Sequence, residues 1–278
     1  MLAIADEEPD LIPDFALSRP TTVDDAIRCL SEGGVPYVGG TELVAAMLIG
    51  VLAPPHLVDL KGVTELKGVR AADGHLTIGA ATKHREVAGS SEVRRHAPML
   101  ATACSRLGNM RVRASGSIGG NICFADPRSD VTTALFALRA HVSLRSPDGQ
   151  RTVPIEDFIL GAMEANRTDE ELLEAIHVPI TADHHVYLRH QPSEYPTVCI
   201  GVVADRDRPH GTARIVVGAV GERPQPFDVP SVDEVDLAAI VPGLDVMEDL
   251  NGSEDYKRHL AGVFIGRAVA QLKESINA

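Results

Sequence analysis

The sequence of 278 residues contains no tryptophan, and aromatic residues make up only 4% of it. This scarcity argues against a groove that stacks bases or sugars on aromatic side chains. Acidic residues outnumber basic ones by 39 to 26, so the net charge is −13, and such a surface repels nucleic acid and anionic membranes. No apolar run approaches the roughly 20 residues that span a bilayer. We therefore expect neither a nucleic-acid partner nor a membrane span.

Cysteine is also scarce, and the four cysteines, Cys29, Cys104, Cys123 and Cys199, are far apart in the sequence. Zinc sites and iron–sulfur clusters are typically bound by closely spaced thiolates, so we predict no metal site on this chain. Free thiols in a reducing compartment are the simplest interpretation. The first residues lack the basic and apolar regions of a signal peptide, and the sequence predicts a cytoplasmic protein.

Glycine, in contrast, is concentrated in residues 113–130, which read RASGSIGGNICFADPRSD. Gly116, Gly119 and Gly120 lie within five residues of one another. Glycine adopts positive φ and lets the backbone approach a ligand closely, and successive exposed N–H groups form an anion-binding nest. The stretch predicts a phosphate-binding turn, followed by carboxylates that reach a ribose. A tight turn between two strands is the alternative.

A second glycine pair, Gly39-Gly40, lies between a predicted strand at Val35–Val38 and a predicted helix. Thr41 is placed to cap that helix, and the N–H groups of a helix N-terminus favour a phosphate. An ordinary strand–helix junction is the alternative. Together, the two glycine turns predict a site that holds a dinucleotide from two sides.

The remaining pattern predicts an α+β protein without internal repeats. Thr22, followed by Asp24 and Asp25, is placed to cap a helix with one apolar face, and Asp73-Gly74 predicts a hairpin turn. Residues 82–106 read as two helices separated at Pro98, and the C-terminal part reads as three strands followed by helices at about 235–240 and 256–275. We expect a flexible leader at 1–13, a first domain at 14–180 with subdomains of about 14–60 and 61–180, and a C-terminal α+β domain at 181–278.

Four motifs, in this order, resemble one family: Val38-Gly39-Gly40-Thr41-Glu42-Leu43, Ile78-Gly79-Ala80, Ser117-Ile118-Gly119-Gly120-Asn121, and Asp126-Pro127 followed by Asp130. The family is the FAD-binding subunit of the molybdenum hydroxylases, which includes the medium subunit of carbon monoxide dehydrogenase and the flavin domain of xanthine dehydrogenase. The resemblance covers about residues 14–275. It implies an FAD-binding domain of the PCMH or vanillyl-alcohol-oxidase type, made of two α+β subdomains, and a smaller C-terminal α+β domain.

The resemblance also implies which residues hold the cofactor. The first turn would wrap the pyrophosphate with backbone N–H groups, and the second would hold the other side of the dinucleotide. Asp130 matches a family aspartate that contacts an FAD hydroxyl, with a helix cap as its alternative role. Asp126 reads as a turn residue, with a cofactor ligand as its alternative role. No histidine lies close to the first turn in the sequence, where His56 is the nearest, so we expect non-covalent FAD. The predicted cofactor-binding residues are Tyr37, Val38, Gly39, Gly40, Thr41, Glu42, Leu43, Leu107, Ser117, Gly119, Gly120, Asn121, Asp130, Leu173, Arg189 and Tyr195.

In the family, a substrate is hydroxylated at a molybdenum cofactor on a large subunit, and electrons pass through two [2Fe-2S] clusters on a small subunit to FAD. The resemblance therefore implies an electron-transfer subunit with these two partners, as a dimer of heterotrimers, and no catalytic side chain on this chain. A stand-alone FAD-dependent oxidase or dehydrogenase is one alternative, although we find no acid–base constellation for it. A non-catalytic nucleotide-binding assembly module is another.

Overall fold

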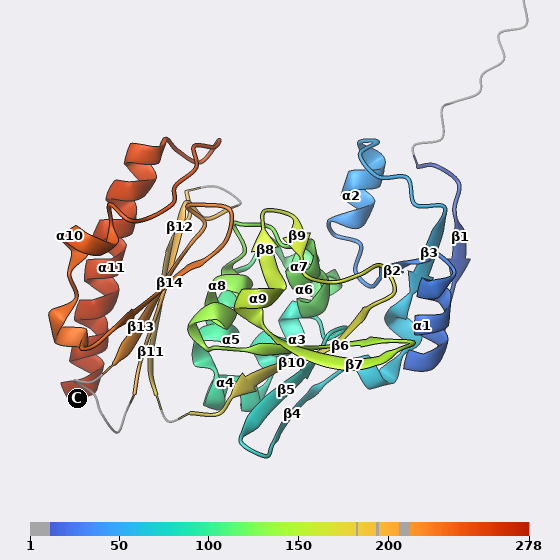
Figure 1. Ribbon diagram of the computed structural model, residues 1–278, viewed down its shortest axis with the longest axis horizontal. Helices are drawn as coiled ribbons and strands as arrows, with labels where there is room; N and C mark the ends of the chain where they lie inside the picture. Colours follow the sequence, from blue (N-terminus) through green and yellow to red (C-terminus); the bar gives the residue numbers. More distant parts are fainter. Residues whose placement is uncertain (1–11, 182, 193–194, 206–211, 278) are drawn as a thin grey trace, which may run out of the picture.

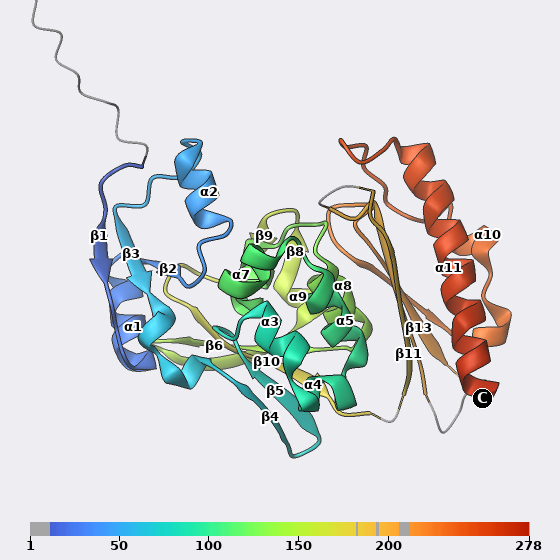
Figure 2. The same cartoon turned by 180° about the vertical axis from the view of Figure 1, so that it is seen from behind.

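The computed structural model describes residues 12–181, 183–192, 195–205 and 212–277. Three sheets with their helices lie in a row along the longest axis, with the N-terminal sheet at one end and the long C-terminal helix at the other (Figures 1 and 2). Most of the predicted leader falls outside the described residues. Within those residues, every helix is too short or too polar to span a bilayer.

The first sheet is parallel, in the order β1-β3-β2, and is covered by one helix. Thr22 caps this helix as predicted, because its Oγ1 accepts the N–H of Asp25, and the apolar face is buried. Short 3-10 turns follow β3, at Leu60–Gly62 and Thr64–Leu66. The elements are β1 (Ala16–Ser18), α1 (Val23–Ser31), β2 (Val35–Tyr37), α2 (Leu43–Leu48) and β3 (His56–Asp59).

The second sheet is antiparallel and has β10 in its middle, in the order β4-β5-β10-β6-β7. Asp73 and Gly74, both with positive φ, form the predicted hairpin turn between its first two strands. A short hairpin, β8–β9, lies beside it. The elements are β4 (Val69–Ala72), β5 (His75–Gly79), β6 (His141–Ser146), β7 (Gly149–Pro154), α9 (Ile155–Phe158), β8 (Ile159–Gly161), β9 (Glu164–Ala165) and β10 (Leu172–Pro179).

Helices pack against this sheet and form the largest core of the protein. Residues 82–106 form three helices instead of the predicted two, because Ser90 caps a separate helix through its Oγ and the N–H of Val93. The predicted glycine turn is helical as well, and the next subsection describes it. The helices are α3 (His84–Gly89), α4 (Ser91–His96), α5 (Pro98–Arg106), α6 (Met110–Ser115), α7 (Ile118–Phe124) and α8 (Asp130–Ala137).

The third sheet is antiparallel, in sequential order, and both of its faces are covered. One face shares the central core through Tyr187, Cys199 and Val216, and the other packs against α11. The sequence predicted three strands here and missed the fourth, whose proline and partly exposed residues suit only an edge strand. The elements are β11 (His184–His190), β12 (Val198–Ala204), β13 (Ala213–Gly218), β14 (Gln225–Val229), a 3-10 turn (Val232–Glu234), α10 (Leu237–Ile240) and α11 (Glu254–Asn277).

Candidate cofactor-binding site

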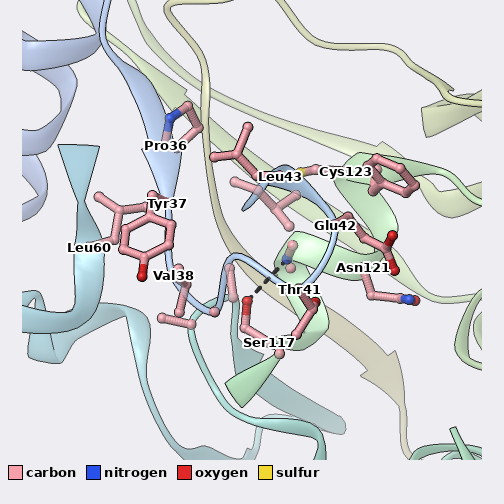
Figure 3. A pocket seen from close by; sticks show the side chains of 18 of the residues that line it. Pro36, Tyr37, Val38, Thr41, Glu42, Leu43, Leu60, Ser117, Asn121 and Cys123 are labelled. Carbon is pink, nitrogen blue, oxygen red and sulfur yellow. Dashed lines mark hydrogen bonds between the residues drawn. The ribbon is translucent and has the colours of Figure 1, made fainter. Parts of the chain in front are cut away.

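A cavity lies where the turn after β2 faces α7 and the start of β10. The cavity has a volume of about 270 Å³, slightly below the range of about 300–1,000 Å³ that is common for ligand pockets in proteins. Figure 3 shows Thr41 and Glu42 of the turn close to Ser117 and Asn121 of α7. The cavity therefore brings together the two glycine-containing segments, which are about 80 residues apart in the sequence.

The first glycine pair forms an open turn. Gly40 has φ = +66°, and a Cβ at this position would lie 2.7 Å from the ring of Tyr37, so glycine is required here. Within the described part of the chain, the N–H groups of Gly39, Gly40 and Thr41 donate no hydrogen bond. The predicted cap is wrong, because the helix begins after Glu42 and receives no side-chain cap. The turn thus presents unpaired backbone donors beside the cavity, as an anion site requires.

The second glycine stretch is a helix start whose donors are already in use. Ser117 caps α7, with its Oγ accepting the N–H of Gly120 at 3.2 Å. The N–H groups of Ile118 and Gly119 donate to the carbonyls of Thr82 and Ala80, at 3.0 and 2.9 Å. None of the three glycines in this stretch has positive φ. The predicted anion-binding nest is therefore wrong for residues 118–120, because the helix cap and the neighbouring segment use their N–H groups.

The glycines of the two segments serve close packing. A Cβ on Gly39 would lie 2.2 Å from the carbonyl oxygen of Ser115, and a Cβ on Gly119 would lie 2.6 Å from the Cβ of Ala80. Gly120 differs, because a Cβ there would meet only the Oγ of Ser117, at 3.1 Å. Gly120 lines the cavity and is exposed to it. Gly39 therefore lets the two segments pack together, Gly119 lets α7 pack against Ala80, and Gly120 leaves room for a ligand.

A second, smaller cavity of about 90 Å³ lies next to the first and extends toward the C-terminal sheet. Glu42, Leu107 and Asn121 line both cavities. Asn121 Oδ1 accepts the hydroxyl of Ser129 at 2.7 Å, which fixes the amide at the junction. The two cavities are therefore neighbours that share part of their walls.

Asp126 and Arg128 form one wall of the second cavity. Asp126 accepts the backbone N–H of Arg128 at 2.8 Å, as predicted for a turn residue, and also binds its guanidinium at 2.9 and 2.7 Å. This guanidinium stacks on the ring of Tyr195, 3.8 Å from the centroid. Burial, and next the charge of Asp126, raise the pKa of Glu42. The place where the two cavities meet is thus acidic, and Arg128 connects Asp126 to the ring of Tyr195 from the C-terminal unit.

Asp130 ties the helix α8 to the C-terminal sheet. Its carboxylate accepts the Tyr187 hydroxyl at 2.5 Å and the Arg189 guanidinium at 2.7 Å, and it is 2% exposed. Burial raises the pKa of Asp130, and the hydrogen bond from Tyr187 and the charge of Arg189 oppose the rise. The alternative role as a helix cap is wrong, because Ser129 caps α8. Asp130 lines the second cavity while its two shortest hydrogen bonds come from β11, and the thiol of Cys199 in β12 donates to the same carboxylate at 3.5 Å.

The structure brings nearly all of the predicted residues to these two cavities. Asp130 and Tyr195 line the second cavity, and Arg189 lines neither but binds Asp130. Among the described residues, no group of three or more histidine, cysteine, aspartate or glutamate side chains is arranged for a metal ion. Thirteen of the sixteen line the first cavity: Tyr37, Val38, Gly39, Gly40, Thr41, Glu42, Leu43, Leu107, Ser117, Gly119, Gly120, Asn121 and Leu173.

Sequence reasoning missed His84 and Arg128. His84 lines the first cavity although it is 43 positions after Thr41, whereas His56, nearest in sequence to the first turn, hydrogen-bonds Ser18 and lines neither cavity. Burial lowers the pKa of His84 to about 4, so its imidazole is neutral at physiological pH. The only signal was its place just after Gly79-Ala80-Ala81, where small residues permit close packing under α7.

Three comparisons bear on this site. Residues 13–181 match the family described as FAD binding domain in molybdopterin dehydrogenase. The chain is 28% identical over 278 residues to the carbon monoxide dehydrogenase medium chain of Hydrogenophaga pseudoflava, which covers 92% of this chain and 96% of the relative. It is 33% identical over 181 residues to the xanthine dehydrogenase FAD-binding subunit of Escherichia coli O157:H7, which covers 64% and 62%.

The fold agrees with these sequences. A solved structure of carbon monoxide dehydrogenase from Hydrogenophaga pseudoflava superimposes with a TM-score of 0.86 at 27% identity, over 93% of this chain and 97% of that one. The match confirms the predicted α+β fold class and the predicted family. The chain belongs to the family of FAD-binding domains in molybdopterin dehydrogenases.

Proposed function

We propose that this chain binds FAD in the first cavity and serves as the electron-transfer subunit of a multi-subunit molybdenum hydroxylase. One observation carries the proposal: a turn with unpaired N–H groups faces the exposed Gly120 across a cavity that both glycine segments line, within a domain of the FAD-binding family. The chain is accordingly an oxidoreductase subunit, and FAD supplies the redox chemistry when bound.

The residues of the cavity fit this cofactor. The N–H groups of Gly39, Gly40 and Thr41 would hold the pyrophosphate, because unpaired amides in a turn form an anion site without a basic side chain. Ser117 and Asn121 would hold the opposite side, where Gly120 allows close approach. A buried ring nitrogen of His84 has no partner in the described protein, and such orphaned polar atoms are rare where no ligand or water satisfies them.

The second cavity suits the flavin end of the cofactor. Leu107 lines both cavities and Leu173 lines the first, so they provide the apolar surface at the junction. Tyr195, held by Arg128, would lie against the isoalloxazine ring. Burial, and next the charge of Asp126, raise the pKa of Glu42, because both disfavour its charged form beside this cavity. Asp130 and Arg189 would act mainly by fixing β11 beside this end.

The proposal includes the setting of the subunit. The names of the relatives, "medium chain" and "FAD-binding subunit", describe parts of larger enzymes. We propose a molybdenum-cofactor large subunit and an iron–sulfur small subunit as partners, in a dimer of heterotrimers, with FAD bound non-covalently. A cytoplasmic location is part of the proposal, and four cysteines without disulfides support it. The division into units at about residues 60 and 180 is proposed as well.

The test is spectroscopic. The purified chain, incubated with FAD and freed of excess ligand, should show a flavin absorption spectrum with one flavin per chain, released by acid because it is not covalently attached. Co-expression with candidate large and small subunits should yield a complex in which substrate reduces this flavin. A chain that stays colourless under both conditions would refute the proposed function.

A further inference from the structure

His84 is the first residue of α3 and lies beneath the junction of the two glycine segments. Its backbone N–H donates to the carbonyl of Gly116 at 3.2 Å. A Cβ on Gly116 would meet His84 Cδ2 at 3.2 Å and Thr41 Oγ1 at 3.4 Å, so the imidazole and the Thr41 side chain converge on the same backbone. The ring therefore lies beside the turn that presents the unpaired N–H groups.

The two ring nitrogens of His84 differ. Nδ1 is sealed from solvent and has no hydrogen-bond partner among the described residues. Nε2 also has no hydrogen-bond partner among the described residues, but unlike Nδ1 it is not sealed from solvent. Because the whole residue is 2% exposed and lines the first cavity, Nε2 is the polar atom of the ring that the cavity reaches.

The protonation of the ring follows from this arrangement. Its pKa of about 4, lowered by burial and then by the charge of Lys83, keeps the imidazole neutral. A neutral imidazole has one N–H and one acceptor nitrogen. Leaving an N–H unpaired in the sealed position would be more costly than leaving an acceptor there. The proton therefore resides on Nε2, the nitrogen that faces the cavity.

We propose that His84 is a cofactor-binding residue whose Nε2–H donates a hydrogen bond to an anionic or hydroxyl oxygen of the dinucleotide, beside the pyrophosphate turn. This inference rests on the proposed function. It adds an imidazole donor to a part of the cavity that also presents backbone N–H groups and the hydroxyls of Thr41 and Ser117. It also accounts for a polar ring in an otherwise apolar interior position.

The test is FAD binding to the apoprotein, measured by titration calorimetry or flavin fluorescence, together with thermal unfolding of the apoprotein. His84→Phe keeps a ring of similar size but removes both nitrogens. It should weaken FAD binding about 10- to 100-fold, the range expected for one lost hydrogen bond to a charged group. The unfolding temperature of the apoprotein should stay the same or rise, because a buried unpaired polar group is replaced by an apolar one.

A second histidine provides a matched control. His177 in β10 is half-buried, bonds to Thr77 and Ser143 at 3.2 and 3.1 Å, and lines neither cavity. His177→Phe should therefore lower the stability of the apoprotein and leave FAD affinity unchanged within about threefold. If His84 had only a structural role, His84→Phe would likewise lower the stability of the apoprotein and leave FAD affinity unchanged.

Two further variants identify the nitrogen. The side-chain amide of Gln extends about as far as Nε2, and that of Asn about as far as Nδ1. His84→Gln should thus retain more FAD affinity than His84→Asn, and this pair decides the matter if His84→Phe fails to fold. If the wild-type chain binds FAD and all three variants bind it equally well, the inference is wrong while the proposed function stands. If the wild-type chain binds no FAD, the proposed function itself has failed.

Discussion

The two glycine segments of the cofactor cavity look alike in sequence and differ in structure. Residues 38–41 form an open turn with Gly40 at positive φ and with unpaired N–H groups. Residues 116–120 form the capped start of α7, where the N–H groups are bonded to Thr82, Ala80 and Ser117. Adjacent glycines therefore identify places where two backbones meet closely, but not which of the two backbones has donors left for a ligand.

The largest expected effect comes from filling the contact that joins the two segments. Gly39→Ala places a Cβ 2.2 Å from the carbonyl oxygen of Ser115. The clash is with backbone atoms, so no flexible side chain can move away to relieve it. Overpacking of this kind typically costs about 1–3 kcal/mol and sometimes more, so we expect a loss of about 3 kcal/mol in the free energy of unfolding, together with loss of FAD. Denaturant unfolding and the flavin spectrum measure both.

Gly89→Ala is the control for this prediction. Gly89 is the last residue of α3 and has no positive φ, and a Cβ added there would meet no heavy atom of another segment within 4 Å. Alanine there should leave stability unchanged or raise it by up to about 1 kcal/mol. Equal stability of the Gly39 and Gly89 variants would show that the two segments are not held together by this contact.

A smaller difference in stability is expected between variants of the two hydroxyl residues of the cavity, Ser117 and Thr41. Ser117 Oγ caps α7, so Ser117→Ala should lower stability by about 1 kcal/mol. Thr41 caps no helix, so Thr41→Ala should change stability by less than about 0.5 kcal/mol. Unfolding of both apoproteins under the same conditions makes the comparison. A Thr41 variant that is as destabilised as the Ser117 variant would contradict the difference between an open turn and a capped helix.

The sequence was sufficient where local rules decide the structure. Thr22 followed by acidic residues predicted the start of α1, and Asp73-Gly74 predicted a hairpin. The resemblance located most of the residues that line the first cavity. These features depend on short segments whose neighbours in sequence are also their neighbours in space.

The sequence was insufficient where long-range contacts decide. Serine at position 117 is a good cap, but α7 also depends on carbonyls of Ala80 and Thr82 that come from another segment. His84 has no motif of its own, and only the fold brings it beside the first turn. Asp130 was expected to contact the cofactor, and its two strong partners lie 57 and 59 positions away in β11.

Gly120→Val provides the most direct test that the space between the two glycine segments holds FAD. A Cβ at this exposed position would meet only the Ser117 hydroxyl, so we expect the valine variant to fold, and its side chain would occupy the space left for the cofactor. The measurement is the flavin-to-protein ratio after FAD incubation and gel filtration, with Gly89→Val as the matched control. The account predicts a ratio near one for the wild type and the control and near zero for Gly120→Val, with unfolding temperatures of the apoproteins that agree. A folded Gly120→Val protein that retains one FAD per chain would contradict it.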